Sequence, residues 1–197
     1  MIYIYGDSHA KFLFSQLQSP YIMNFVPGIT MHRVGRDNQI LKFDTTFHEQ
    51  DTTLCFVYGE IDCRHHIQRQ IDKGRQEEEV IQTLVCKYID TIRNNIRLCK
   101  QVFIIGVVPT TSQSDFNNVH GTEHGFLFSG TEEDRIRITQ KVNDGLHMLC
   151  DKYDFTFLAP YDFYTGDDGC LIRKYSDSTV HIRNNAHFLK LFTEARV

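Results

Sequence analysis

The sequence lacks a hydrophobic run long enough to cross a membrane, because no apolar stretch approaches the roughly 18 residues that a membrane helix requires. It also lacks an excess of positive charge: its 197 residues include 21 Lys and Arg against 25 Asp and Glu, a formal net charge of -4. Nucleic-acid-binding proteins normally carry a basic patch. We therefore expect neither a membrane nor a nucleic acid as a partner.

Two further absences concern the cellular compartment. The N-terminus has no basic and apolar leader of the secretory type, and none of the six cysteines forms a Cys-x-x-Cys pair. Scattered cysteines of this kind are typical of free thiols in a reducing compartment. We therefore expect a cytoplasmic protein, and no feature of the sequence specifies its oligomeric state.

Apolar strand-like runs alternate with helix-like stretches along the whole chain. The runs that predict strands are 2–5, 31–34, 53–60, 101–109 and 155–160. Helical spacing of apolar residues predicts helices within 10–17, 76–99, 131–153 and 184–195, whereas the polar segment 110–130 predicts a long loop. This order is typical of an α/β fold, with helices on both faces of a mainly parallel five-stranded sheet. No repeat or linker divides the chain, so we expect one domain over residues 1–197.

Polar clusters follow three of the apolar segments. Gly6-Asp7-Ser8-His9 follows the first run, residues 59–64 end the third, and Tyr175 to His181 lie beyond the last. Ligands of parallel α/β sheets bind at the carboxyl ends of the strands, so we expect these clusters to meet. A serine hydroxyl is a weak nucleophile until a base accepts its proton. Ser8 is thus the candidate nucleophile, with His181 as its base and Asp177 to orient the imidazole.

Each of these residues also has a purely structural interpretation. Ser8 is a favoured residue type for capping a helix, and Asp7 is able to brace the turn through backbone N–H groups. His181 is otherwise an ordinary loop histidine, and His187 is its rival as the base, although the helical pattern around His187 favours a structural role. The combination of the three clusters favours catalysis.

The same residues resemble the four sequence blocks of the SGNH/GDSL hydrolases. Gly6-Asp7-Ser8 is similar to the first block, Gly35 to the second, Gly59 with Asp62 to the third, and Asp177 with His181 to the last. The resemblance implies a flavodoxin-like, three-layer αβα sandwich and hydrolysis or transfer of an acyl ester.

The resemblance also implies roles for backbone groups and the third block. It makes the N–H groups of Ser8 and Gly35 the donors to the oxyanion, and it places Gly59 and Asp62 beside the site, where Asp62 is expected to fix the loop.

The sequence departs from the family pattern at two positions. Ile61 stands where the family has an asparagine that donates to the oxyanion, and losing one such donor typically costs about 10²–10³ in rate. Arg64 is the candidate substitute, with a salt-bridged loop arginine as the alternative. Three residues separate Asp177 from His181 where the family has two. A one-residue bulge would absorb the difference; otherwise Ser178 occupies the expected aspartate position.

Ten histidines raise the question of a metal site. The clusters His65-His66 and His120, Glu123 and His124 do not have the order or the helical context of a zinc-protease motif. The segment 166–169 (GDDG) has too few carboxylates for an EF-hand and predicts a turn. We expect no metal and no cofactor.

The sequence therefore predicts a serine hydrolase that cleaves a small-molecule or glycan acyl ester, with an acetyl group on a carbohydrate as a candidate. Two alternatives stay open. Acyl transfer to a sugar hydroxyl would use the same triad, and a non-catalytic binding domain would explain Ile61 and the longer Asp177–His181 spacing.

Overall fold

The computed structural model describes residues 1–37, 51–96, 99–123 and 125–196. Its centre is a five-stranded sheet in the order β2-β1-β3-β4-β5, and every pair of neighbouring strands is parallel. The strands are β1 (Ile2–Gly6), β2 (Tyr21–Phe25), β3 (Thr53–Val57), β4 (Gln101–Ile105) and β5 (Thr156–Leu158). The predicted α/β class and parallel sheet are confirmed.

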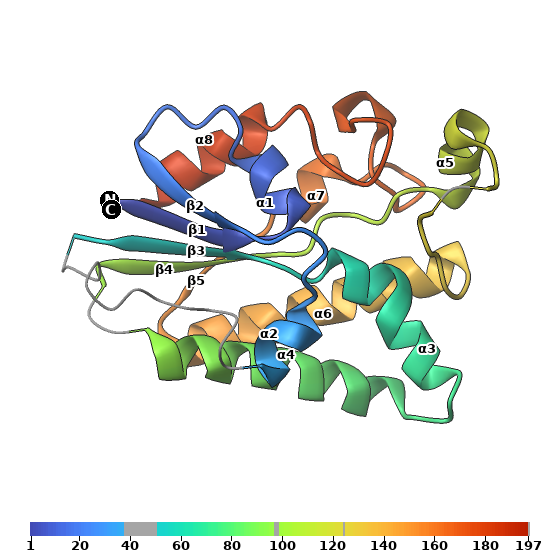
Figure 1. The fold of residues 1–197 in the computed structure, drawn as a ribbon, viewed down its shortest axis with the longest axis horizontal. Helices are drawn as coiled ribbons and strands as arrows, with labels where there is room; N and C mark the ends of the chain where they lie inside the picture. The colour runs from blue at the N-terminus through green and yellow to red at the C-terminus, as the bar shows by residue number, and fades with distance from the viewer. Residues whose placement is uncertain (38–50, 97–98, 124, 197) are drawn as a thin grey trace.

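Helices cover both faces of the sheet (Figure 1). One face packs against α1 (Ser8–Leu13), α7 (Tyr161–Tyr164) and α8 (Ala186–Ala195), and the other against α2 (Met31–Arg36), α4 (Glu77–Asn95) and α6 (Glu132–Tyr153). Alternate residues of β1 point to opposite faces, as strand geometry requires. Ile2 and Ile4 pack in the core beneath α1 and α8, whereas Tyr3 and Tyr5 pack in the core beneath α4 and α6. The result is the expected three-layer sandwich.

The two long helices form where the apolar spacing predicts them. In α4, Val80, Leu84, Ile89 and Ile92 are buried, and three acids stand in the first turn, where the helix dipole favours negative charge. Thr131 begins α6 with a capping box, in which its side chain and that of Asp134 bond each other's backbone N–H groups.

The predicted second strand, 31–34, is wrong. These residues form α2, because Thr30 Oγ1 accepts the N–H of Arg33 at 3.1 Å and caps a helix. Met31 and Val34, three residues apart, are buried on one side of that helix. Such a short run fits both periodicities. The real second strand is β2, an edge strand of the sheet whose residues are only half-buried or exposed.

The segment 110–130 is not entirely a loop. It contains the helix α5 (Gln113–His120). The side chain of Phe116 in α5 is buried, and its ring centroid lies 5.0 Å from that of Phe126 and 5.5 Å from that of Phe128. The remaining helical turns are η1 (Asp62–His66), α3 (Ile67–Ile71) and η2 (Arg173–Tyr175).

Two observations bear on the expectations from composition. All six cysteines are free. Over the described ranges, no helix combines the length and the apolar character that a membrane span needs.

Candidate active site

Ser8 lies at the point where β1 gives way to α1. The side chain of Asp7 caps the helix by accepting the N–H of His9 at 2.9 Å, so Ser8 becomes the first helical residue. A side chain at Gly6 would collide with Ala10 Cβ and the Val57 carbonyl oxygen, which explains why glycine precedes the turn. The turn presents the Ser8 hydroxyl at the carboxyl edge of the sheet, as predicted.

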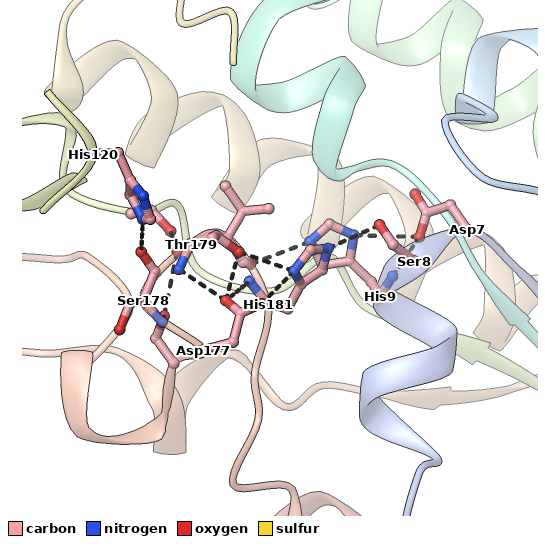
Figure 2. Close-up of polar contacts among 11 residues, drawn as sticks. Asp7, Ser8, His9, His120, Asp177, Ser178, Thr179 and His181 are labelled. Atoms are coloured by element: carbon pink, nitrogen blue, oxygen red, sulfur yellow. Dashed lines mark hydrogen bonds and ion pairs between the residues drawn. The ribbon is translucent and has the colours of Figure 1, made fainter. Parts of the chain in front are cut away.

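The structure brings Ser8, His181 and Asp177 together in one line (Figure 2). His181 Nε2 lies 2.9 Å from Ser8 Oγ, and His181 Nδ1 lies 2.8 Å from Asp177 Oδ2. The histidine and aspartate side chains are mostly buried, with 12% and 15% of their surfaces exposed. This is the geometry that a hydroxyl nucleophile, a base and an orienting carboxylate require.

A bulge absorbs the extra residue between Asp177 and His181. Ser178 adopts a φ of 71°, and Ser176 pairs with Ile182 in an antiparallel bridge that closes the turn. Asp177 therefore reaches the imidazole, and Ser178 does not replace it. The carbonyl oxygen of Ser178 instead lies 2.7 Å from Nε2 of His120 in α5.

Thr179 completes the hydrogen bonding of Asp177 and has no counterpart in the sequence-based prediction. Both its N–H and its hydroxyl donate to Asp177 Oδ1. Partial burial raises the pKa of Asp177, but hydrogen bonds from His181 and Thr179 outweigh it and hold the pKa well below its usual range. The carboxylate thus stays ionised beside the imidazole.

His9 is a second buried histidine at the site, which the sequence analysis also missed. Its Nδ1 lies 3.2 Å from Asp7 Oδ1, its Nε2 lies 3.2 Å from the Val180 carbonyl oxygen, and its ring centroid is 4.7 Å from that of His181. Burial lowers the pKa of His9, yet the charge and hydrogen bond of Asp7, with smaller help from Glu60, raise it overall. His9 therefore ties the serine turn to the backbone that precedes His181.

The ring of Phe12 packs against the imidazole of His181. The ring centroids of Phe12 and His181 are 4.3 Å apart and nearly parallel, at 12°. Phe12 follows Ser8 by one helical turn, so the i, i+4 relation in α1 is the signal that would have found it.

Gly35 lies within a helix, which corrects the prediction that it follows a strand and donates its N–H to the oxyanion. It belongs to α2, where a Cβ would lie 3.0 Å from the backbone of Lys87 and Tyr88 in α4. The absence of a side chain at Gly35 therefore allows α2 and α4 to pack closely. The glycine that follows the real second strand is Gly28, with a φ of 69°; β2 pairs with β1, and Val26 N–H donates to the Gly6 carbonyl at 3.0 Å.

Arg64 is held by Glu60 and by the backbone of the loop before α6. Its Nε and Nη2 donate to the two oxygens of Glu60 at 2.6 and 3.2 Å, and its Nη1 donates to the Leu127 carbonyl at 2.7 Å. The guanidinium also lies over the rings of Phe126 and Phe128. These contacts correct the prediction that Arg64 replaces the missing asparagine, because they make it a buried tie between η1 and the loop before α6.

Gly59 and Asp62 shape the loop after β3. Gly59 has a φ of 122°, and a Cβ there would lie 2.7 Å from Met31 Cε and 2.8 Å from Val107 Cγ2. Asp62 accepts the N–H groups of Met31 and His32 at 2.7 and 3.3 Å, so it fixes the start of α2. Burial raises the pKa of Asp62 to about 7 against the effect of these two bonds.

The histidine clusters have partners within the protein. His65 Nδ1 lies 2.7 Å from Ser129 Oγ, and His187 stacks on Phe163 at 3.5 Å, which is the structural role expected for it. His124 lies outside the described residues. Within the residues that are described, no group of three or more His, Cys, Asp or Glu side chains has the arrangement of a metal site. The segment 166–169 forms a turn, closed by Gly169 N–H on the Gly166 carbonyl.

Comparison with known proteins places the fold. No family model and no curated sequence matches, but solved structures do. A "putative platelet activating factor" from Streptococcus pneumonia aligns with a TM-score of 0.65 and 13% identity, over 97% of this chain and 82% of that one.

Two further structures agree. A GDSL-like lipase from Bacteroides thetaiotaomicron has a TM-score of 0.55 and 13% identity, over 98% and 86% of the two chains. A variant of an acetyl-xylooligosaccharide esterase from Geobacillus stearmophilus has a TM-score of 0.53 and 12% identity, over 98% and 92%. At such identities the likeness concerns the fold, and this chain has the fold of the SGNH/GDSL hydrolase superfamily.

Proposed function

We propose that this protein is a serine hydrolase of the SGNH type that cleaves an acyl ester. One observation carries the proposal: Ser8 Oγ lies 2.9 Å from His181 Nε2, while Asp177 Oδ2 lies 2.8 Å from the other ring nitrogen. A serine that only capped a helix would need no base, and a base that only filled a loop would need no orienting carboxylate. The fold shared with GDSL esterases supports the same conclusion.

The proposed reaction has two steps. Ser8 Oγ attacks the ester carbonyl carbon while His181 Nε2 takes its proton, and the resulting imidazolium returns that proton to the departing alcohol as the ester C–O bond breaks. Water then attacks the acyl-serine, with His181 again as the base, and releases the acid and free Ser8. Asp177 stabilises the charged imidazole throughout.

Backbone N–H groups are the proposed donors to the oxyanion. The first N–H groups of a helix have no partner within it, and Ser8 occupies that position in α1. Gly28, three residues after the end of β2, is the proposed counterpart of the second-block glycine, the role that the sequence suggested for Gly35. Ile61 has no side-chain donor, so we expect turnover about 10²–10³ below that of a site with the complete set.

The proposed substrate is a small or carbohydrate-bound acyl ester. One structural neighbour is an acetyl-xylooligosaccharide esterase, and that name supports an acetyl group on a carbohydrate as the first substrate to test. Acyl transfer to a sugar hydroxyl differs only in the acceptor that replaces water. Product analysis in the presence of a free sugar separates the two reactions.

Labelling with a fluorophosphonate probe tests the proposal. We expect stoichiometric labelling of the wild-type protein, followed by its loss in Ser8→Ala and its strong reduction in His181→Ala. Ser178→Ala is the matched control, because this exposed serine stands in the triad loop and should leave labelling intact. A folded wild-type protein that does not label would favour a non-catalytic binding domain instead.

A further inference from the structure

A cavity of about 620 Å³ lies among α2, α3 and α4. Gly28 lines its edge toward the proposed oxyanion site, but Ser8, Asp177 and His181 are not among the described residues that line it. Its inner wall is apolar, since the buried side chains of Ile67, Val80 and Leu84 line it. These residues belong to the core on the α4 face of the sheet, whereas α1 lies on the other face. The volume is within the range of about 300–1,000 Å³ that small-molecule sites occupy.

Cations surround this apolar wall. Arg33, Arg75 and Lys87 line the cavity, and all three are exposed. Asp62 is the single acid among the described lining residues, and its two oxygens already accept the backbone N–H groups at the start of α2. Glu79, which does not line the cavity, forms an ion pair with Arg75, with 2.9 Å between Glu79 Oε1 and Arg75 Nη2. The local charge is therefore positive in a protein whose formal net charge is -4.

Two histidines respond to this positive potential. His32 and His66 line the cavity, and burial lowers the pKa of each. Nearby cations lower both values further: Arg36 and Lys87 act on His32, and Arg69 acts on His66. Both rings are therefore neutral at pH 7, with one donor and one acceptor nitrogen each. Such rings suit hydroxyl or ester oxygens beside a charged group.

We propose that this cavity is a binding site for a small phosphorylated molecule. Its phosphate would lie between Arg33 and Lys87, because guanidinium and ammonium groups form charge-assisted hydrogen bonds with phosphate oxygens. Its apolar carbon body would pack against Ile67 and Leu84. A purely apolar ligand would leave the cations unused, and a free inorganic ion would leave the apolar wall uncovered. The proposed phosphate contacts use none of the triad residues, so this binding does not require the proposed hydrolysis.

Calorimetric titration with phenyl phosphate tests this site, since that probe combines an apolar ring with a phosphate. We expect saturable binding to the wild-type protein, weaker binding of inorganic phosphate and none of phenol at the same concentrations. Binding should also weaken as NaCl rises, because salt screens exposed charges. Ser8→Ala protein should bind equally well, so a failure here is separable from a failure of the hydrolase proposal.

Charge reversal locates the binding. Lys87→Glu should weaken phenyl phosphate binding by about 10–100-fold, the value of one charge-assisted hydrogen bond, and Arg33→Ala should act in the same direction. Lys190→Glu is the matched control, because Lys190 is an exposed helical lysine on α8, in the opposite layer. Absence of binding to the wild-type protein, or equal affinities for the Lys87→Glu and Lys190→Glu variants, would overturn the proposal.

Discussion

Replacing His9 with leucine isolates the buried pair beside the triad. Only 4% of His9 is exposed, and both ring nitrogens face acceptors, Asp7 Oδ1 and the Val180 carbonyl oxygen, each at 3.2 Å. The doubly protonated ring satisfies both acceptors, whereas the neutral ring donates to only one. The His9→Leu variant removes this cation and leaves the carboxylate of Asp7 buried without its partner.

The magnitude follows from the cost of breaking a buried pair. Removing one partner of such a pair typically destabilises a protein by about 3–5 kcal/mol, so we expect at least ~3 kcal/mol at pH 5.5. The raised pKa of His9 means that the folded protein binds its proton more tightly than the unfolded chain does. Its contribution is therefore fully present below about pH 6.5 and is lost as the pH rises through the higher folded-state value. Each unit of difference between the two pKa values is worth about 1.4 kcal/mol.

Urea unfolding of the wild-type protein and the His9→Leu variant at pH 5.5 and pH 9 measures this effect. The destabilisation should be smaller at pH 9, and NMR titration of the His9 ring should give a pKa that accounts for the difference. His147→Leu is the control, since 61% of that side chain is exposed. A destabilisation that is independent of pH, or larger at pH 9, would refute the assignment of a buried cation.

Three other substitutions test individual parts of the site. Asp177→Asn should lower kcat for an acyl ester by about 10³–10⁴, the effect known for the orienting aspartate of such triads, with little change in the thermal midpoint; unchanged kcat would remove Asp177 from the machinery. Arg64→Ala should destabilise the protein by about 3–5 kcal/mol, because Glu60 would lose its buried partner, and turnover per folded molecule should change less than tenfold; a 10²-fold loss of turnover in stably folded protein would restore the oxyanion role. Gly59→Ala should lower stability by about 1–3 kcal/mol more than Gly74→Ala in chemical unfolding, since both glycines have positive φ but only Gly59 lacks space for a Cβ; equal losses would show that packing there is unimportant.

The central strands and long helices were predictable because burial leaves a strong pattern in the sequence. Residues 53–57 and 101–105 are almost continuously apolar, as strands covered on both faces must be. The edge strand β2 was not predicted, because it is short, its burial does not alternate regularly, and the half-buried Asn24 interrupts its apolar run. The helix α2 was predicted as a strand because its six residues are too few to show the helical spacing of apolar side chains.

The meeting of Ser8, Asp177 and His181 was predictable from their order in the chain, whereas the surroundings of Gly35 and Arg64 were not. Ser8, Asp177 and His181 follow strand ends that a parallel sheet must bring to one edge. Gly35 was chosen as the second-block glycine because it follows the predicted strand 31–34, and that strand is a helix in the structure. The prediction that Arg64 donates to the oxyanion was wrong because its guanidinium pairs with Glu60, four residues earlier. The residue type alone does not show which acceptor an arginine will bond.

Mass spectrometry of the acyl-enzyme tests the central claim most directly. Wild-type protein mixed with p-nitrophenyl acetate and quenched with acid before deacylation should carry one acetyl group, and peptide analysis should assign it to Ser8. The Ser8→Ala variant should carry none under the same conditions. Acetylation of wild-type protein at another residue, or hydrolysis that persists in Ser8→Ala at the wild-type rate, would contradict the account.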